Sequence, residues 1–292
     1  MNTIYHDSPF SDDQRRAALY NGQLFVYTPT ATALAFIEFA REMIESAFGG
    51  LDPITAQYHM PVEEYVALLS RLKPAFIHHP RSKEFLQAIL TERGCDPELT
   101  YFDVPRMRTS TSDGYLTSGI AYAFHPHRDT WYSAPMCQIN WWLPIYEVEA
   151  GNVMAFHPHY FNRAVRNGSR EYNYQQWVAT SRKEAAKHIK QDTRKQPQPE
   201  EAIELDPQIR IVTPPGGLLA FSAAHMHSSV PNYTGKTRFS IDFRTVHLGD
   251  IRNGKGARNV DSESTGTTLG DFLRASNLEH LPSEIIEPYL TA

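Results

Sequence analysis

Apolar residues recur at helical spacing through much of the first hundred residues. Over 30–48 they repeat every three or four positions, with Thr30 or Thr32 available to cap the start and Gly49-Gly50 to end the pattern. The same spacing predicts a second helix over 61–72 and a third over 82–92. A short strand is predicted before them. This part of the chain carries few residues that suggest chemistry.

After Pro97 the pattern changes to short alternating stretches rich in aromatic and β-branched residues, which is typical of strands. A polar segment over 162–208, with a predicted helix at 172–190, interrupts them. Long insertions in β-rich regions are more often functional than idle. The predicted strands are 22–28, 99–109, 114–123, 136–148, 152–156, 209–212, 218–222 and 238–246, and the segment 124–130 is expected to be extended.

Helices followed by many short strands predict a mainly β, α+β fold. We expect a double-stranded β-helix, or jelly roll, with the N-terminal helices packed on it. All 292 residues would form one domain. Its parts would be a helical 1–98, a core over 99–250 that carries the 162–208 insertion, and a tail over 251–292.

Charge and composition narrow the class of partner. A net charge of −5 gives no general attraction to nucleic acid or to an anionic membrane. No apolar run is long enough to span a bilayer, and the N-terminus lacks the pattern of a signal peptide. Two cysteines, Cys95 and Cys137, favour a reducing compartment, so a cytoplasmic location is expected. The sequence leaves the oligomeric state open.

The main chemical candidate is His127-Arg128-Asp129. On an extended segment, residues two apart point to the same face. A second histidine on a neighbouring strand would complete two imidazoles and one carboxylate, a ligand set that suits non-haem Fe(II) and leaves positions open. His225 and His227 both lie in a suitable stretch.

The strand that follows these histidines offers an anion site. Arg238 and Ser240 share one face of the strand predicted over 238–246, together with Asp242 and Arg244. An arginine binds a carboxylate through two charge-assisted hydrogen bonds, and a hydroxyl adds a donor. The face therefore suits a dicarboxylate.

These residues resemble the Fe(II)/2-oxoglutarate-dependent oxygenases, and in particular the phytanoyl-CoA dioxygenase-like superfamily. The matching pieces are His127-Arg128-Asp129, the stretch PPGGLLAFSAAHMHSSVPN, and Arg238-Phe239-Ser240. In that family an asparagine commonly follows the distal histidine by five residues and an arginine by eleven. Asn232 (232 − 227 = 5) and Arg238 (238 − 227 = 11) fit His227, and neither offset fits His225.

The resemblance implies a set of cofactors and a reaction. His127, Asp129 and His227 would hold Fe(II), Arg238 would bind 2-oxoglutarate, and Ser229 and Ser240 would assist. With O₂, such an enzyme hydroxylates an unactivated C–H bond through a ferryl intermediate and releases succinate and CO₂. A carboxylate at Asp129 argues against halogenation. Desaturation, epoxidation and cyclisation would use the same machinery.

Other residues are candidates for the walls of the site. Gln138 and Trp142 share a strand face and are predicted to contact the cosubstrate. Residues expected to meet the substrate, a small and polar metabolite, are His125, Tyr132, Asn140 and Arg106.

Two other classes of protein stay open at this point. His125-Pro126-His127 has the His-x-His spacing of a cupin-like metal enzyme that does not use 2-oxoglutarate, but the glutamate expected a few residues later is missing. A non-catalytic binding jelly roll would take up no metal.

Overall fold

The computed structural model describes residues 3–117, 125–181 and 194–290, and the fold is mixed α/β with most strands antiparallel. Its helices are α1 (Asp12–Tyr20), α2 (Ala31–Phe48), α3 (Val62–His78), α4 (Pro80–Glu92), α5 (Tyr174–Thr180), α6 (Leu248–Arg252) and α7 (Ser283–Leu290). Its strands are β1 (Ile4–His6), β2 (Leu24–Tyr27), β3 (Thr100–Phe102), β4 (Arg106–Ser110), β5 (Ile139–Pro144), β6 (Met154–Phe156), β7 (Ile209–Arg210), β8 (Leu218–Ser222), β9 (His227–Ser229), β10 (Arg238–His247) and β11 (Leu273–Arg274).

Two sheets form the centre of the molecule. Within the described residues, the larger sheet has the order β1-β2-β8-β5-β10-β3-β11, and β4 also pairs with β10. Every pairing in it is antiparallel except β1 with β2. The smaller sheet has the order β7-β6-β9. Strands that are neighbours in space are therefore distant in sequence.

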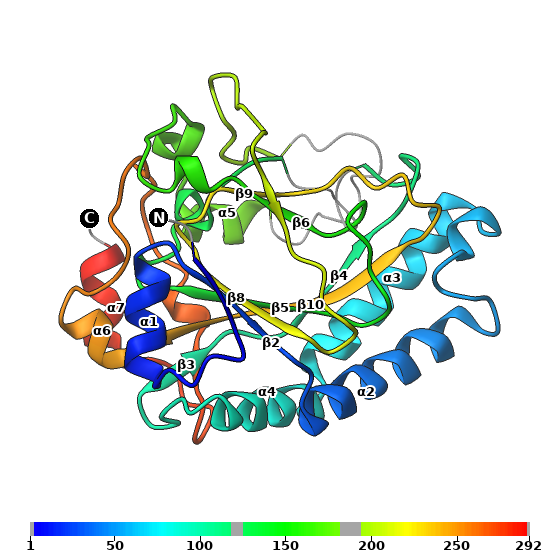
Figure 1. The fold of residues 1–292 in the computed structure, drawn as a ribbon, viewed down its shortest axis with the longest axis horizontal. Coiled ribbons are helices and arrows are strands. Elements are labelled where there is room, and N and C mark those ends of the chain that lie inside the picture. Colours follow the sequence, from blue (N-terminus) through cyan, green and yellow to red (C-terminus); the bar gives the residue numbers. More distant parts are fainter. Residues whose placement is uncertain (1–2, 118–124, 182–193, 291–292) are drawn as a thin grey trace.

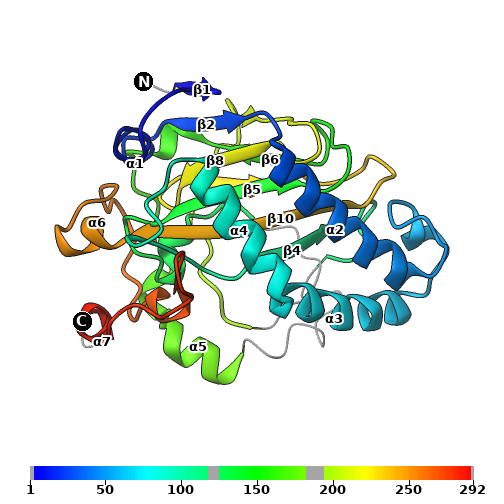
Figure 2. The same cartoon turned by 90° about the horizontal axis from the view of Figure 1, so that it is seen from below.

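A helical layer covers one face of the larger sheet. Helices α2 and α4 lie below the sheet in Figure 1, with β6 and β9 above it, and Figure 2 shows α2, α3 and α4 across the face of the sheet. Trp141 of β5 and Phe239 of β10 pack into this helical core. Trp142, on the opposite face of β5, packs between the sheets with Phe156 and Phe221. The alternation along β5 and β10 thus separates a helix-facing core from a face that looks toward the smaller sheet.

The predicted limits of α2 are confirmed. The hydroxyl oxygen of Thr30 accepts a hydrogen bond from the backbone N–H of Ala33, and Gly49 ends the helix with a φ of 60°. Helix α3 extends beyond the predicted range, through Pro74 to His78. Phe76 is fully buried in the core, so packing of the last turn offsets the hydrogen bond that the proline removes.

Other predictions were wrong in part. The strand expected over 99–109 is two strands that pair in succession with β10, interrupted at Asp103-Val104-Pro105, where proline cannot donate to the ladder. The polar helix expected over 172–190 is seen as α5, and residues 182–193 lie outside the described residues. The strand expected over 114–123 falls largely on 118–124, which also lie outside them. Helix α1, capped by Ser11, was not predicted.

In the described part of the chain, none of the helices combines the length and the apolar character needed to cross a membrane.

The helix-facing core gives a direct test of this packing. Phe239 is 0% exposed, whereas Tyr233 is 76% exposed. Phe239→Ala should lower the free energy of unfolding by about 3–5 kcal/mol, because it removes buried apolar surface and leaves a cavity. Tyr233→Ala should change it by less than about 0.5 kcal/mol. Urea unfolding followed by circular dichroism measures both, and similar values for the two would contradict the layer arrangement.

Candidate metal centre

Two backbone hydrogen bonds join His127 to His227. The N–H of His127 donates to the carbonyl of His227 at 3.0 Å, and the N–H of His227 donates back at 2.9 Å. His227 begins β9, so the smaller sheet fixes its backbone. This reciprocal pair brings the two imidazole rings to 4.4 Å between centroids.

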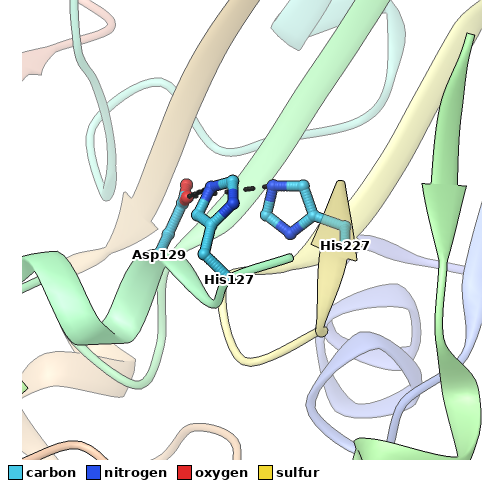
Figure 3. A group of neighbouring side chains, drawn as sticks. All are labelled: His127, Asp129 and His227. Carbon is cyan, nitrogen blue, oxygen red and sulfur yellow. Dashed lines mark ion pairs between the residues drawn. The ribbon is translucent and has the colours of Figure 1, made fainter. Parts of the chain in front are cut away.

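Asp129 completes the group. Its backbone N–H donates to the carbonyl of Ala223, and its Oδ1 lies 3.4 Å from Nε2 of His127 and 3.9 Å from Nε2 of His227. Figure 3 shows the carboxylate and the two rings turned toward one another. The ligand atoms of the three residues lie within 4.8 Å of one another, a spacing at which they can hold one metal ion.

The expectation of an extended segment through Asp129 was wrong in part. His127 forms a β-bridge, but Asp129 begins a short 3₁₀ helix, Asp129–Tyr132. The backbone of Arg128 between them is extended, so the His127 and Asp129 side chains still point to the same side.

Both histidines expose the same ring nitrogen to the group. Nδ1 of His127 lies 2.8 Å from the carbonyl of His125, and Nδ1 of His227 lies 3.0 Å from that of His225. A carbonyl oxygen only accepts, so each Nδ1 carries the proton and each Nε2 keeps its lone pair. Such a hydrogen bond orients a metal-ligating histidine and fixes its tautomer.

The second oxygen of Asp129 is held away from the rings. Asn140 donates to Oδ2 at 2.9 Å and Gln138 donates to it at 3.4 Å, while Gln138 also donates to Oδ1 of Asn140. Nε of Arg244 lies 3.6 Å from the same oxygen. The carboxylate can therefore offer Oδ1 alone to an ion. The structure places Gln138 and Asn140 against a ligand residue as well as in the wall of the cavity.

Arg244 was not predicted as a site residue. Its backbone N–H and its guanidinium both donate to Asp103, which fixes the arginine beside Asp129. The signal available in the sequence was that Arg244 shares a strand face with Arg238. Nothing in the sequence indicated that Asp103 would lie beside Arg244. Burial acts to raise the pKa of Asp129, but the adjacent His127 and the charge of Arg244 outweigh it and hold the pKa well below its ordinary value.

His225 lies outside the group. Its ring packs 4.7 Å from that of Phe161, and burial lowers its pKa to about 3. Burial and the neighbouring His127 likewise lower the pKa of His227 to about 4, so its Nε2 is unprotonated at neutral pH. His125 is also absent from the group, and its Nε2 lies 3.1 Å from the carbonyl of Pro197. The described residues therefore do not bring His125 and His127 together as a His-x-His ligand pair.

A cavity of about 320 Å³ opens onto the three ligand candidates. Most of the residues expected to contact cosubstrate or substrate line it, whereas Ser240 and His125 do not. The lining includes His127, Asp129, His227, Arg238, Ser229, Gln138, Trp142, Tyr132, Asn140 and Arg106.

Arg238 is a buried cation in this cavity. It is 6% exposed, and its NH1 group donates to the carbonyl of Asn152 at 2.8 Å. Its Nε is buried without a hydrogen-bond partner, and among the described residues no carboxylate forms an ion pair with it. Burial and the charge of Arg108 lower its pKa to about 10. Oγ of Ser240, two residues along the same strand face, is also buried without a partner.

The insertion forms one wall of the cavity. Tyr172, Tyr174 and Trp177 contribute to the lining. The carbonyl of Pro197 lies 3.0 Å from the hydroxyl of Tyr132 and accepts a hydrogen bond from it. The helix predicted over 172–190 did not indicate that Trp177 would face this cavity.

Comparisons with known proteins give structural similarity only. No family model and no curated protein matches the sequence. The solved structure of EvdO2 from Micromonospora carbonacea var. aurantiaca matches with a TM-score of 0.45 at 11% identity, over 82% of this chain and 92% of that one. SnoN, a non-heme alpha-ketoglutarate-dependent epimerase from nogalamycin biosynthesis, matches with 0.41 at 13% identity, over 80% of each chain. ThoJ, a non-heme monooxygenase, matches with 0.40 at 12% identity, over 75% and 71%.

The chain is thus similar to structures of non-heme enzymes, one of which was solved with Fe³⁺ and alpha-ketoglutarate. At these low identities and TM-scores, the chemistry has to be assigned from the site residues themselves.

The choice of distal ligand can be tested directly. His227→Ala should abolish stoichiometric binding of Fe(II) or Co(II), because it removes one of three converging ligand atoms. His225→Ala is the matched control and should keep full stoichiometry. Anaerobic calorimetry of the metal-free protein measures both. Loss of metal in the control alone would move the ligand to His225.

The carboxylate support gives a second test. Arg244→Gln should weaken metal affinity roughly 10- to 100-fold, the usual effect of losing an outer partner of a ligand. Arg166→Gln, at a side chain 74% exposed, is the control and should change nothing. Competition with a chromophoric chelator measures the affinities. Equal affinity in Arg244→Gln and wild type would show that Asn140 and Gln138 suffice to hold Asp129.

Proposed function

We propose that this protein is an Fe(II)- and 2-oxoglutarate-dependent oxygenase that hydroxylates an unactivated C–H bond of a small, polar metabolite. The observation that carries the proposal is the presence, in one cavity, of a buried His/Asp/His group and a buried arginine that lacks an anion. We also propose that the two facing antiparallel sheets form the double-stranded β-helix expected from the sequence.

The donor set fits ferrous iron. Two neutral imidazoles and one carboxylate are ligands that Fe(II) accepts together, and three protein ligands on one face leave positions open. Hydrogen bonds within the protein orient each of the three metal-ligand side chains. The carbonyls of His125 and His225 fix the histidine tautomers, while Asn140 and Arg244 turn one oxygen of Asp129 away from the rings. Little rearrangement is then needed for an ion to bind.

Arg238 and its surroundings fit one carboxylate of 2-oxoglutarate. The guanidinium is desolvated, and its Nε and the nearby Oγ of Ser240 have no partner. Leaving the guanidinium N–H unpaired is costly, so an anion in the cavity that accepts from Arg238 is strongly favoured. Ser229 and Trp142 line the same cavity, and the Arg238 guanidinium lies 6.0 Å from the ring centroid of Trp142. These contacts would hold the cosubstrate in a fixed orientation.

Iron and 2-oxoglutarate together would supply the oxidising power to break a C–H bond with O₂. The chain's own residues position the reactants. His127, Asp129 and His227 hold one face of the ion, Arg238 neutralises cosubstrate charge, and the walls from the insertion and β4 exclude water and orient the substrate. Arg106, Tyr132 and Asn140 lie in this lining and are proposed substrate contacts. His125 would act through its bond to Pro197.

The same machinery can support desaturation, epoxidation or cyclisation, and the outcome depends on which substrate bond is presented. A cupin-like enzyme that needs no 2-oxoglutarate is the alternative class. The two differ in what Arg238 does, because only the first needs a buried cation for a dicarboxylate.

The test is anaerobic addition of Fe(II) and then 2-oxoglutarate, followed by absorbance of the metal-to-ligand charge-transfer band. We expect a band in wild type. In Arg238→Met, 2-oxoglutarate affinity should fall roughly 10- to 100-fold, because charge-assisted hydrogen bonds are lost. Fe(II) binding should be unchanged. No band in wild type would refute the proposed function, and an equal affinity in Arg238→Met would remove Arg238 from the cosubstrate site.

A further inference from the structure

An aromatic series leads from the metal centre into the insertion. The ring of Tyr132 lies 5.6 Å from that of His127, the ring of Tyr172 lies 5.5 Å from that of Tyr132, and Trp177 follows at 6.4 Å from Tyr172. Tyr132, Tyr172 and Trp177 all line the cavity. Aromatic surface therefore extends from beside the proposed iron ligands to the wall formed by α5.

The polar groups of this wall are arranged unevenly. The hydroxyl of Tyr132 donates to the carbonyl of Pro197, and that of Tyr174 donates to the carboxylate of Asp271. Nε1 of Trp177, in contrast, is buried and has no hydrogen-bond partner among the described residues. The wall thus offers ring faces and one indole N–H donor. These groups match a flat ring with one accepting group.

Another part of the cavity lining carries paired guanidinium and carboxylate groups. Arg106 and Arg108 of β4 line the cavity, where Arg106 pairs with Asp103 and Arg108 with Asp242. Asp103 also pairs with Arg244. Arg244 also lies 3.6 Å from Asp129, so these three guanidinium groups meet three carboxylates and their charges balance.

We propose that the substrate carries a planar aromatic ring with a hydrogen-bond-accepting substituent, and that the ring packs against Tyr172 and Trp177. This inference deepens the proposed function and rests on it for the chemistry, but ligand binding does not depend on oxygen or turnover. Oxidation would occur on the part of the ligand directed past Tyr132 toward His127.

The experiment compares three probes by saturation-transfer NMR titration of the full-length protein loaded with Zn(II). The probes are 2-naphthoate, its saturated analogue decalin-2-carboxylate, and glucuronate. All three carry one carboxylate, so differences in affinity report on the ring. We expect naphthoate to bind roughly three- to tenfold more tightly than the decalin, the range expected for favourable ring contacts, and glucuronate to bind most weakly.

Variants connect this preference to the wall. Trp177→Leu should bring the naphthoate-to-decalin ratio close to one, because it removes a ring face. Trp177→Phe keeps a ring face but loses the N–H, so it should lower both affinities and preserve the ratio. Tyr233→Leu, at a side chain 76% exposed, is the control and should change neither. If Trp177→Leu does not fold, the wild-type ratio and Trp177→Phe still decide.

Several outcomes would overturn the inference: no binding of naphthoate, equal affinity for naphthoate and decalin in wild type, tighter binding of glucuronate, or an unchanged ratio in folded Trp177→Leu. Each can be told apart from failure of the proposed function. Arg238→Met should lose 2-oxoglutarate affinity and keep the naphthoate preference, whereas Trp177→Leu should do the reverse.

Discussion

The reciprocal backbone hydrogen bonds between His127 and His227 are the contact on which the site depends. They join a segment that follows the N-terminal helices and β4 to a strand 100 residues later, and they do so at the residues whose side chains converge. Because the backbones are fixed at both positions, the rings have little freedom. The carbonyls two residues earlier then fix which nitrogen each ring presents. The backbone of Arg128 is extended, which places Asp129 on the same side as His127, and a 3₁₀ helix begins at Asp129 itself.

The rest of the fold supports this contact in layers. Alternation along β5 sends Trp141 into the helix-packed core and Trp142 between the sheets, so one strand stabilises the scaffold and lines the cavity at the same time. Strand β10 does the same, with Phe239 on the helical side and Arg238 and Arg244 on the other. The two arginines have different surroundings. Arg244 is saturated by Asp103 and Asp129, whereas Arg238 is desolvated and lacks an anion. This contrast distinguishes Arg244, which supports the metal-ligand candidate Asp129, from Arg238, which is available to bind a carboxylate.

The insertion changes how the cavity should be understood. From the sequence it was a polar interruption in a β-rich region. In the structure it supplies ring faces beside the metal centre and is held to the core by the carbonyl of Pro197, which meets both His125 and Tyr132. His125 and Tyr132 were expected to touch substrate. Their bonds to Pro197 show that they also determine where the insertion lies, and so they shape the space left for a substrate.

The sequence by itself determined what depends on local spacing. It predicted α2 with its caps and the strand β10 with its two faces, because side-chain direction along a helix or strand follows from short-range geometry. The set His127, Asp129, His227 and Arg238 was implied by the resemblance of these residues and their spacing to an oxygenase family. Only the tertiary structure decided the contacts between distant segments. It brought Asp103 to Arg244, turned Asn140 and Gln138 toward Asp129, carried α3 through Pro74, and placed Trp177 in the cavity wall. None of these has a local signature, because each depends on which strands become neighbours when the two sheets close over a shared interior.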